Sequence, residues 1–176
     1  MKRIALVLFI IFGVFGYIVF LSSSTTQNNS DYLRIHIRAN SNLAVDQNVK
    51  YAVKNSLVDA LFPIVANCKS KSELISEIEN NKSYLEEVAN NSLHKAKLDY
   101  CAQISVNSEY FPTRVYNNEI TLKSGIYDAL VVELGNAQGD NWWCIVYPPL
   151  CFMNVNYSKN INYQSRIVEM IKKFFS

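Results

Sequence analysis

The chain has 176 residues, of which 49% are hydrophobic and 18% are charged, and its formal net charge is +2. This length allows one domain of ordinary size, and the apolar content is sufficient for a hydrophobic core. A small positive charge carried by scattered basic residues gives no support for nucleic-acid binding. With 5 glycines in the chain, a glycine-rich phosphate-binding loop is not available.

The beginning of the chain has the layout of an export signal. Lys2 and Arg3 precede an uncharged apolar run, residues 4–21, and small polar residues follow it over 22–30. As a helix, this run would extend about 27 Å, which just crosses the hydrocarbon core of a membrane. The layout therefore predicts either a cleaved signal peptide or an uncleaved membrane anchor.

These features predict four parts in the chain. A signal peptide or transmembrane anchor over residues 1–24 and a linker over 25–31 precede one folded domain over 32–157. An amphipathic helix over 158–176 ends the chain. The positive-inside rule places the basic start in the cytoplasm and everything after the apolar run outside. We therefore expect an exported protein, secreted or anchored, in a compartment where disulfides can form.

Residues 33–40 alternate between apolar and polar side chains, which predicts a half-buried strand. One face of this strand is aliphatic, and the other carries Arg34, His36, Arg38 and Asn40. Two interpretations of the polar face remain open. It is either an ordinary solvated face or a cationic patch that contacts a carboxylate or an anionic surface.

Helical spacing follows this strand. A turn signal at 40–42 leads into a first helix with Asp46 in its first turn, where the helix dipole favours an anion, and Pro63 marks its expected end. A second helix is expected from Ser72 to about residue 98, with a bend at 80–81.

A period-two pattern predicts a strand near 102–107, and two apolar runs predict further strands near 127–134 and 142–147. The last two are apolar enough for central strands and could pair as a hairpin through a long loop, residues 135–140. A short amphipathic helix over 161–175 docks either on the domain or on a membrane surface. We therefore predict an α+β fold in which two long helices cover one face of a mostly antiparallel or mixed sheet, plus the N-terminal segment.

Residues 141–152 hold both tryptophans and two of the four cysteines. Seven residues of extended strand would separate Cys144 and Cys151 by about 23 Å, whereas a disulfide needs Cα atoms within about 7 Å. A bridge therefore requires the chain to fold back at Pro148-Pro149, and without such a turn both cysteines are reduced and buried. The residues expected to hold the sheet together are Asn141, Trp142, Trp143, Cys144, Pro148, Pro149 and Cys151.

Catalytic signals in the sequence are weak. A cysteine nucleophile needs a base and an orienting group, and Cys144 with His36 and Asp140 would supply those residue types. The sequence shows no serine nucleophile elbow, no metal-ligand pair and no paired-carboxylate motif. We expect no metal and no cofactor. The alternative functions are an exported cysteine-dependent envelope hydrolase that uses Cys144 and an envelope structural component.

Four segments in this order resemble the stage II sporulation protein R family of endospore-forming bacteria, over about residues 31–152. The chain departs from the family pattern at Asn117, where a glycine is usual, at Lys123-Ser124, where Pro-Ala is usual, and at Val131, where Arg is common. The segments that carry the resemblance are 33–42 with Asp46, Gln47 and Lys50, then Phe111-Pro112-Thr113-Arg114-Val115-Tyr116, then 125–130, and then Asn141-Trp142-Trp143-Cys144 through Pro148-Pro149-Leu150-Cys151-Phe152.

The resemblance implies a non-enzymatic signal between two cells. Such a protein is made in the forespore and exported into the space between the forespore and mother-cell membranes. There it is expected to activate the membrane-embedded aspartic protease that processes the sigma-E precursor. The implied partners are this protease and the membrane, with no nucleic acid. The expected contact residues are Arg34, His36, Arg38, Asn40, Asp46, Phe111, Pro112, Thr113 and Arg114.

Overall fold

The computed structural model describes residues 29–116, 120–152 and 161–175. The expected signal or anchor over residues 1–24 lies outside this part of the chain. Among the helices of the described ranges, none is both long enough and apolar enough to cross a membrane.

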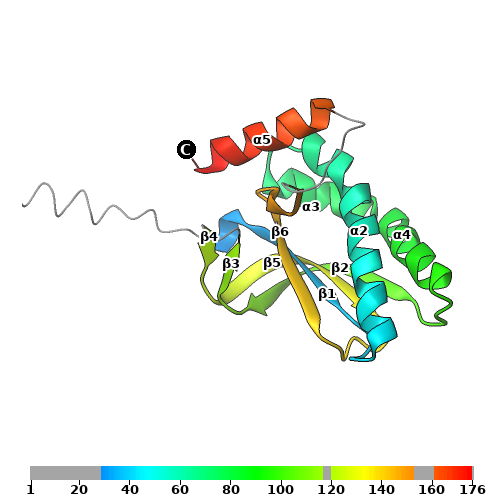
Figure 1. Ribbon diagram of the computed structural model, residues 1–176. Coiled ribbons are helices and arrows are strands. Elements are labelled where there is room, and N and C mark those ends of the chain that lie inside the picture. Colours follow the sequence, from blue (N-terminus) through cyan, green and yellow to red (C-terminus); the bar gives the residue numbers. More distant parts are fainter. Residues whose placement is uncertain (1–28, 117–119, 153–160, 176) are drawn as a thin grey trace, which may run out of the picture.

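Four strands form one sheet in the order β2-β5-β1-β6 (Figure 1). The central strand β1 (Leu33–Arg38) runs parallel to β5 (Gly125–Leu134) and antiparallel to β6 (Asn141–Tyr147). At the other side of β5, strand β2 (Ala102–Phe111) pairs with it in antiparallel orientation. The predicted α+β fold with a mixed sheet is therefore confirmed.

The expected hairpin between the strands near 127–134 and 142–147 is wrong, because β1 lies between β5 and β6. The connecting loop passes across the end of β1 instead. Its Gly139 nitrogen donates to the Ala39 carbonyl at 2.8 Å, and the Gln138 nitrogen donates to the Asn40 carbonyl at 3.2 Å. A central strand that pairs on both sides satisfies its backbone groups completely, which two adjacent strands alone do not achieve.

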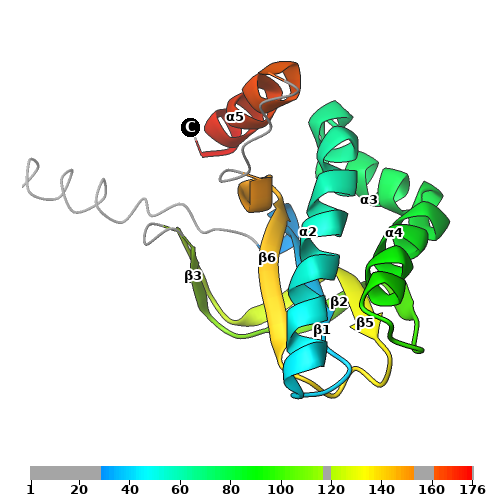
Figure 2. The same ribbon diagram turned by 45° about the vertical axis from the view of Figure 1, so that its right-hand side comes forward.

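Three helices cover one face of the sheet (Figure 2). They are α2 (Ala44–Asn67), α3 (Lys71–Asn80) and α4 (Lys82–Lys95). The aliphatic face of β1 packs beneath them in the main hydrophobic core. Helix α2 passes through Pro63, so the expected end at that residue is wrong. Proline removes one helical hydrogen bond, and burial of the apolar side chains of the following turn offsets this loss.

The second expected helix is two helices. The predicted bend at 80–81 is a break, with Asn81 at the end of α3 and the start of α4. The N-cap of α3 is Ser70 rather than Ser72, because the Ser70 hydroxyl accepts a hydrogen bond from the Glu73 nitrogen at 3.2 Å. This capping satisfies one of the free donors of the first turn.

The opposite face of the sheet is covered as well. A hairpin of β3 (Arg114–Tyr116) and β4 (Ile120–Leu122) folds over it and encloses a second, smaller core. The expectation of a half-buried β1 is therefore wrong, since Arg34 is 0% exposed and His36 is 6% exposed. The second core contains Tyr32, Phe111, Leu122, Tyr127, Ala129, Val131, Ile145 and Leu150.

The remaining described helices are short or terminal. The 3-10 turns η1 (Asn29–Asp31) and η2 (Leu150–Phe152) flank the sheet, and the amphipathic α5 (Ile161–Phe175) lies against α2. The ring of Phe62 lies 5.9 Å from that of Tyr163. We expected this helix to pack either on the domain or on a membrane surface, and in the structure it packs on the domain.

A buried carboxylate joins the end of β1 to the start of α2. Asp46 is 2% exposed and accepts three hydrogen bonds, from Asn40 at 2.9 Å, Ser41 at 2.6 Å and Tyr100 at 2.6 Å. Burial raises the pKa of this carboxyl, but the three hydrogen bonds outweigh burial and leave the pKa below its ordinary value. Asp46 therefore contributes stability in its ionised form.

We predict that Asp46→Asn lowers the free energy of unfolding by about 1–3 kcal/mol at pH 7. The asparagine amide has one acceptor oxygen, and its NH2 donor would face side chains that themselves donate. A depressed folded-state pKa contributes stability above the ordinary value of about 3.9, and this contribution disappears as pH falls through the folded-state pKa. The difference between the two proteins should consequently shrink below about pH 4. Urea unfolding followed by circular dichroism at several pH values measures it, and a difference independent of pH would contradict the prediction.

Candidate functional site

The polar face of β1 gathers three cationic or titratable side chains between two layers of protein. Alternation along the strand directs Arg34, His36 and Arg38 away from the helices and toward the β3–β4 hairpin side. Arg34 and His36 are buried, and Arg38 is half-buried. This face is therefore an internal charged layer rather than an open cationic patch.

Arg34 is enclosed by aromatic rings. Its Cζ lies 4.0 Å from the ring centroid of Phe111, 4.9 Å from that of Tyr127 and 5.7 Å from that of Tyr116. One nitrogen, Nη2, donates to the Tyr116 hydroxyl, while Nε and Nη1 donate to no described residue. Burial lowers the pKa of this guanidinium, and the Tyr116 phenol acts in the opposite direction. The π faces of the rings therefore stabilise the charge where no carboxylate is in contact.

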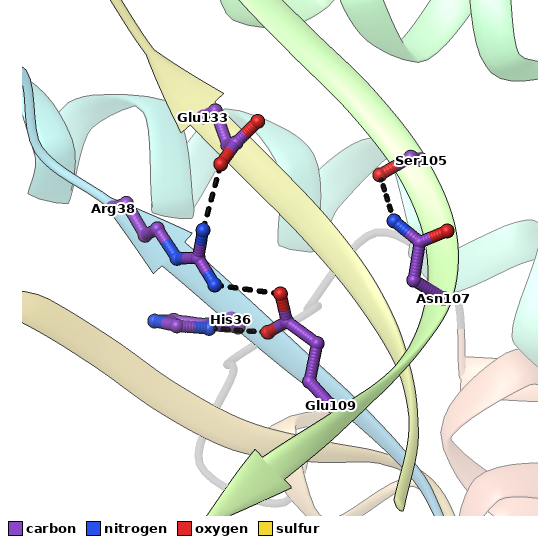
Figure 3. Close-up of polar contacts among 6 residues, drawn as sticks. All are labelled: His36, Arg38, Ser105, Asn107, Glu109 and Glu133. Atoms are coloured by element: carbon purple, nitrogen blue, oxygen red, sulfur yellow. Dashed lines mark hydrogen bonds and ion pairs between the residues drawn. The ribbon is translucent and has the colours of Figure 1, made fainter. Parts of the chain in front are cut away.

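Glu109 of β2 connects the other two side chains of this face (Figure 3). Its Oε2 lies 2.7 Å from His36 Nδ1, and its Oε1 accepts from Arg38 Nη2 at 2.6 Å. The second terminal nitrogen of Arg38 donates to Glu133 of β5 at 2.7 Å. Carboxylates from two strands thus balance the charge of the central strand, and their charge-assisted hydrogen bonds fix the position of Arg38.

The imidazole of His36 lies between two aromatic side chains. Its ring centroid is 5.5 Å from that of Trp143 and 5.8 Å from that of Phe111. The Nε2 atom is buried and has no hydrogen-bond partner among the described residues. Glu109 orients this ring as an orienting carboxylate would orient a catalytic base, but the ring is packed within the smaller core.

The turn after β2 divides its residues between core and surface. Phe111 is buried, Pro112 is half-buried, and Thr113 and Arg114 are exposed. The guanidinium carbon of Arg114 lies 4.2 Å from the ring centroid of Trp143, which is a cation–π contact at the surface. Of the nine expected contact residues, the exposed Thr113 and Arg114 are the most accessible to a partner.

Asn40 and Asp46, which were also expected as contact residues, use their polar atoms internally. Asp46 accepts the three hydrogen bonds described above, one of them from Asn40. The Asn40 carbonyl oxygen Oδ1 accepts in turn from the Asn136 nitrogen at 2.9 Å. These two residues therefore position the ends of the strands instead of presenting a free surface.

The stretch 141–152 folds back on itself. Cys144 and Cys151 form a disulfide with their Cα atoms 5.9 Å apart, as the required turn at Pro148-Pro149 allows. The Leu150 nitrogen donates to the Pro148 carbonyl at 2.7 Å, and the Tyr147–Pro148 peptide bond is cis. Both prolines are buried, Trp142 and Trp143 are half-buried, and Asn141 at the start of β6 is exposed.

The structure does not bring together the expected catalytic pair of Cys144 and His36. On the paired strands, Trp143 lies opposite His36 and Cys144 lies opposite Ile35. Neighbouring residues of a strand point to opposite faces, so the cysteine faces the helices with Ile35 while the histidine faces the hairpin side. The sulfur is in addition bonded to Cys151, and it is not a free thiolate.

Sequence reasoning missed the acidic and aromatic partners of this face. Glu109 and Glu133 hold Arg38, and Tyr116 and Tyr127 enclose Arg34. Glu109 follows the alternation of its strand, so its place on the polar face could be predicted from the sequence. Its position next to β1 could not, because the pairing of distant strands cannot be read from one sequence.

We predict that Glu109→Gln lowers the free energy of unfolding by about 1–3 kcal/mol, since the amide loses one of two charge-assisted hydrogen bonds and turns a donor toward His36 or Arg38. Glu133→Gln is the matched control, because its side chain is 39% exposed and its one ion pair is with Arg38; it should cost about 0.5 kcal/mol. Chemical denaturation of both variants compares them. Equal losses would contradict the central position assigned to Glu109.

Comparisons with known proteins identify the family of this chain. The model of the family described as stage II sporulation protein R matches residues 29–157. The stage II sporulation protein R of Bacillus subtilis (strain 168) is 25% identical over 172 residues, which are 93% of this chain and 76% of that protein. The alpha subunit of ribonucleoside-diphosphate reductase from Buchnera aphidicola subsp. Schizaphis graminum (strain Sg) is 38% identical over 78 residues, which are 44% of this chain and 10% of that subunit. No solved structure matches the chain significantly.

The family match includes the whole sheet, its covering helices and the disulfide-bonded turn, and the Bacillus subtilis relative extends over nearly the entire chain. The second relative shares less than half of this chain and a tenth of its own length, so it carries no argument about the domain. The resemblance seen in the sequence motifs and the family match thus agree. The chain belongs to the stage II sporulation protein R family, a family of sporulation proteins.

Proposed function

We propose that this protein is an exported signal that passes from the forespore to the mother cell during endospore formation. It acts in the space between the two membranes, where it activates the membrane-embedded aspartic protease that processes the sigma-E precursor. Its N-terminal segment attaches it to the forespore membrane or directs its secretion. The protein acts through its surface, without a catalytic step of its own.

Family membership over residues 29–157 is the observation that carries this proposal. Two further observations support it. The basic start and the apolar run over 4–21 have the layout of an export signal, and the disulfide between Cys144 and Cys151 is typical of proteins in oxidising compartments. The first concerns the route of the protein, and the second concerns its destination.

The geometry around Cys144 favours a signalling role over the alternative, an envelope hydrolase that uses this cysteine. A nucleophilic cysteine acts as a thiolate with a base in reach. Here the sulfur is in a disulfide, and His36 lies on the other face of the sheet. The envelope structural component remains the third alternative, which would require stoichiometric abundance that quantitative proteomics measures.

We predict that sporulating cells from which the gene has been deleted retain the sigma-E precursor in its unprocessed form. An immunoblot for sigma-E during sporulation measures the ratio of precursor to mature protein, and the wild-type gene restored at another locus should recover processing. Normal processing in the deletion strain would sink the signalling proposal.

We predict that Cys144→Ser and Cys151→Ser change signalling by the same factor, because either substitution breaks the same disulfide. The two single variants and the double variant should therefore have equal precursor processing at equal protein level. A catalytic cysteine would behave differently. Loss of processing in Cys144→Ser with full processing in Cys151→Ser would favour the hydrolase.

A further inference from the structure

The two edge strands of the sheet differ in how their outward-facing backbone groups are protected. At the β2 edge, side chains of α4 accept outward-facing backbone donors: the Ala102 nitrogen donates to Asn90 Oδ1 at 2.7 Å, and the Ile104 nitrogen donates to Glu86 Oε1 at 3.0 Å. Such capping removes the template that an unpaired strand offers to another chain. The β2 edge is thus closed to strand addition along its first half.

The β6 edge has no such protection within the described chain, apart from its end, where the disulfide-bonded turn folds back on the strand. It pairs with β1 on one side, and no described strand pairs with its outer side. Its seven residues, Asn141–Tyr147, include two tryptophans and no charged residue. Proteins ordinarily place charges, prolines or short strands at an exposed edge, and here Pro148 follows only after the strand has ended.

A groove runs beside this edge. It has a volume of about 600 Å³, and Trp142, Trp143 and Val115 form its apolar walls, with Arg114 and Asn141 among its polar residues. Val115 on the hairpin is 60% exposed. Figure 2 shows β6 between the hairpin at one side and α2 at the other. An extended segment laid along β6 would therefore contact side chains from both neighbouring elements.

Each tryptophan of the edge carries a cation over its ring. Arg114 Cζ lies 4.2 Å from the ring centroid of Trp143, and Lys54 Nζ lies 5.7 Å from that of Trp142. Neither cation forms an ion pair with a described residue. Since adjacent residues point to opposite faces, the edge has on each face one positive charge that no described carboxylate pairs. Asp140, directly before the strand, is the one acidic residue among the described residues that line the groove.

We infer that the outer edge of β6 binds an extended acidic segment of a partner protein as an added strand. Two neighbouring acidic side chains on that segment point to opposite faces and meet Arg114 and Lys54, while the backbone pairs with β6. A second copy of this chain is a poorer occupant, because pairing two β6 strands brings like charges together. Assigning the segment to the protease rests on the proposed function, whereas its chemistry does not.

Two peptide probes test the inference on the full-length protein in detergent micelles. One is a fluorescein-labelled peptide that alternates valine and threonine around two adjacent glutamates, and the other has lysines in place of the glutamates. Fluorescence anisotropy should give at least tenfold tighter binding of the glutamate peptide. Hydrogen exchange should slow at backbone amides of 141–145 when this peptide is bound, because strand addition protects outward-facing donors.

Charge reversal supplies the matched variants. Arg114→Glu should weaken binding of the glutamate peptide at least fivefold, and Lys54→Glu should do so to a similar extent. Lys123→Glu, an equal charge change at an exposed position between β4 and β5 that is not among the described residues lining the groove, should leave binding within twofold. Near-UV circular dichroism establishes that the variants keep the fold.

The inference is overturned if neither peptide binds, if both bind equally, if Lys123→Glu weakens binding as much as Arg114→Glu, or if protection falls outside β6. Dimers formed through β6 would also overturn it. The two proposals can fail separately. Peptide binding that fails leaves the deletion test of signalling unaffected, and a deletion strain with normal processing leaves the peptide result unaffected.

Discussion

Burial of both faces of β1 is the constraint on which the structure depends. The aliphatic face lies under the helices, and the charged face lies under a small aromatic layer. Removing guanidinium and imidazole groups from water is costly unless they find partners. Aromatic rings surround Arg34, and Glu109 contacts both His36 and Arg38. Strands β2 and β5 and the β3–β4 hairpin are therefore tied to the central strand by its charges as well as by its backbone.

Hydrogen bonds of polar side chains also hold the ends of the elements in place. The segment after β1 bonds to the buried Asp46 carboxylate and to the loop that leads into β6. At the opposite end of β6, the disulfide and the proline turn close the strand. The motifs that resemble the family thus include strands of the sheet together with the junctions at their ends, where short polar side chains replace regular backbone pairing. A family pattern of this kind reports on architecture before it reports on a partner surface.

The structure changes which of the expected contact residues are accessible to a partner. Arg34, His36, Asn40 and Asp46 support the fold, whereas Arg114 remains at the surface beside the tryptophans. The proposed signalling function requires a surface that a partner can bind, and the edge of β6 combines apolar rings, backbone groups and positive charge. Under this proposal the tryptophan stretch has two roles, one inside the sheet through Cys144 and Ile145 and one at its edge.

Local patterns in the sequence determined most of the elements, although not the break between α3 and α4 or the strands β3 and β4. Period-two alternation predicted β1 and β2, apolar runs predicted β5 and β6, and helical spacing predicted the covering helices. The spacing of Cys144 and Cys151 required a turn between them if they bond. Tertiary structure decided the strand order, the passage of α2 through Pro63, and the hairpin that buries Arg34. The reason is physical: alternation reports that a strand has two unlike faces, but a polar face is solvated or buried according to which distant carboxylates and rings the fold brings to it.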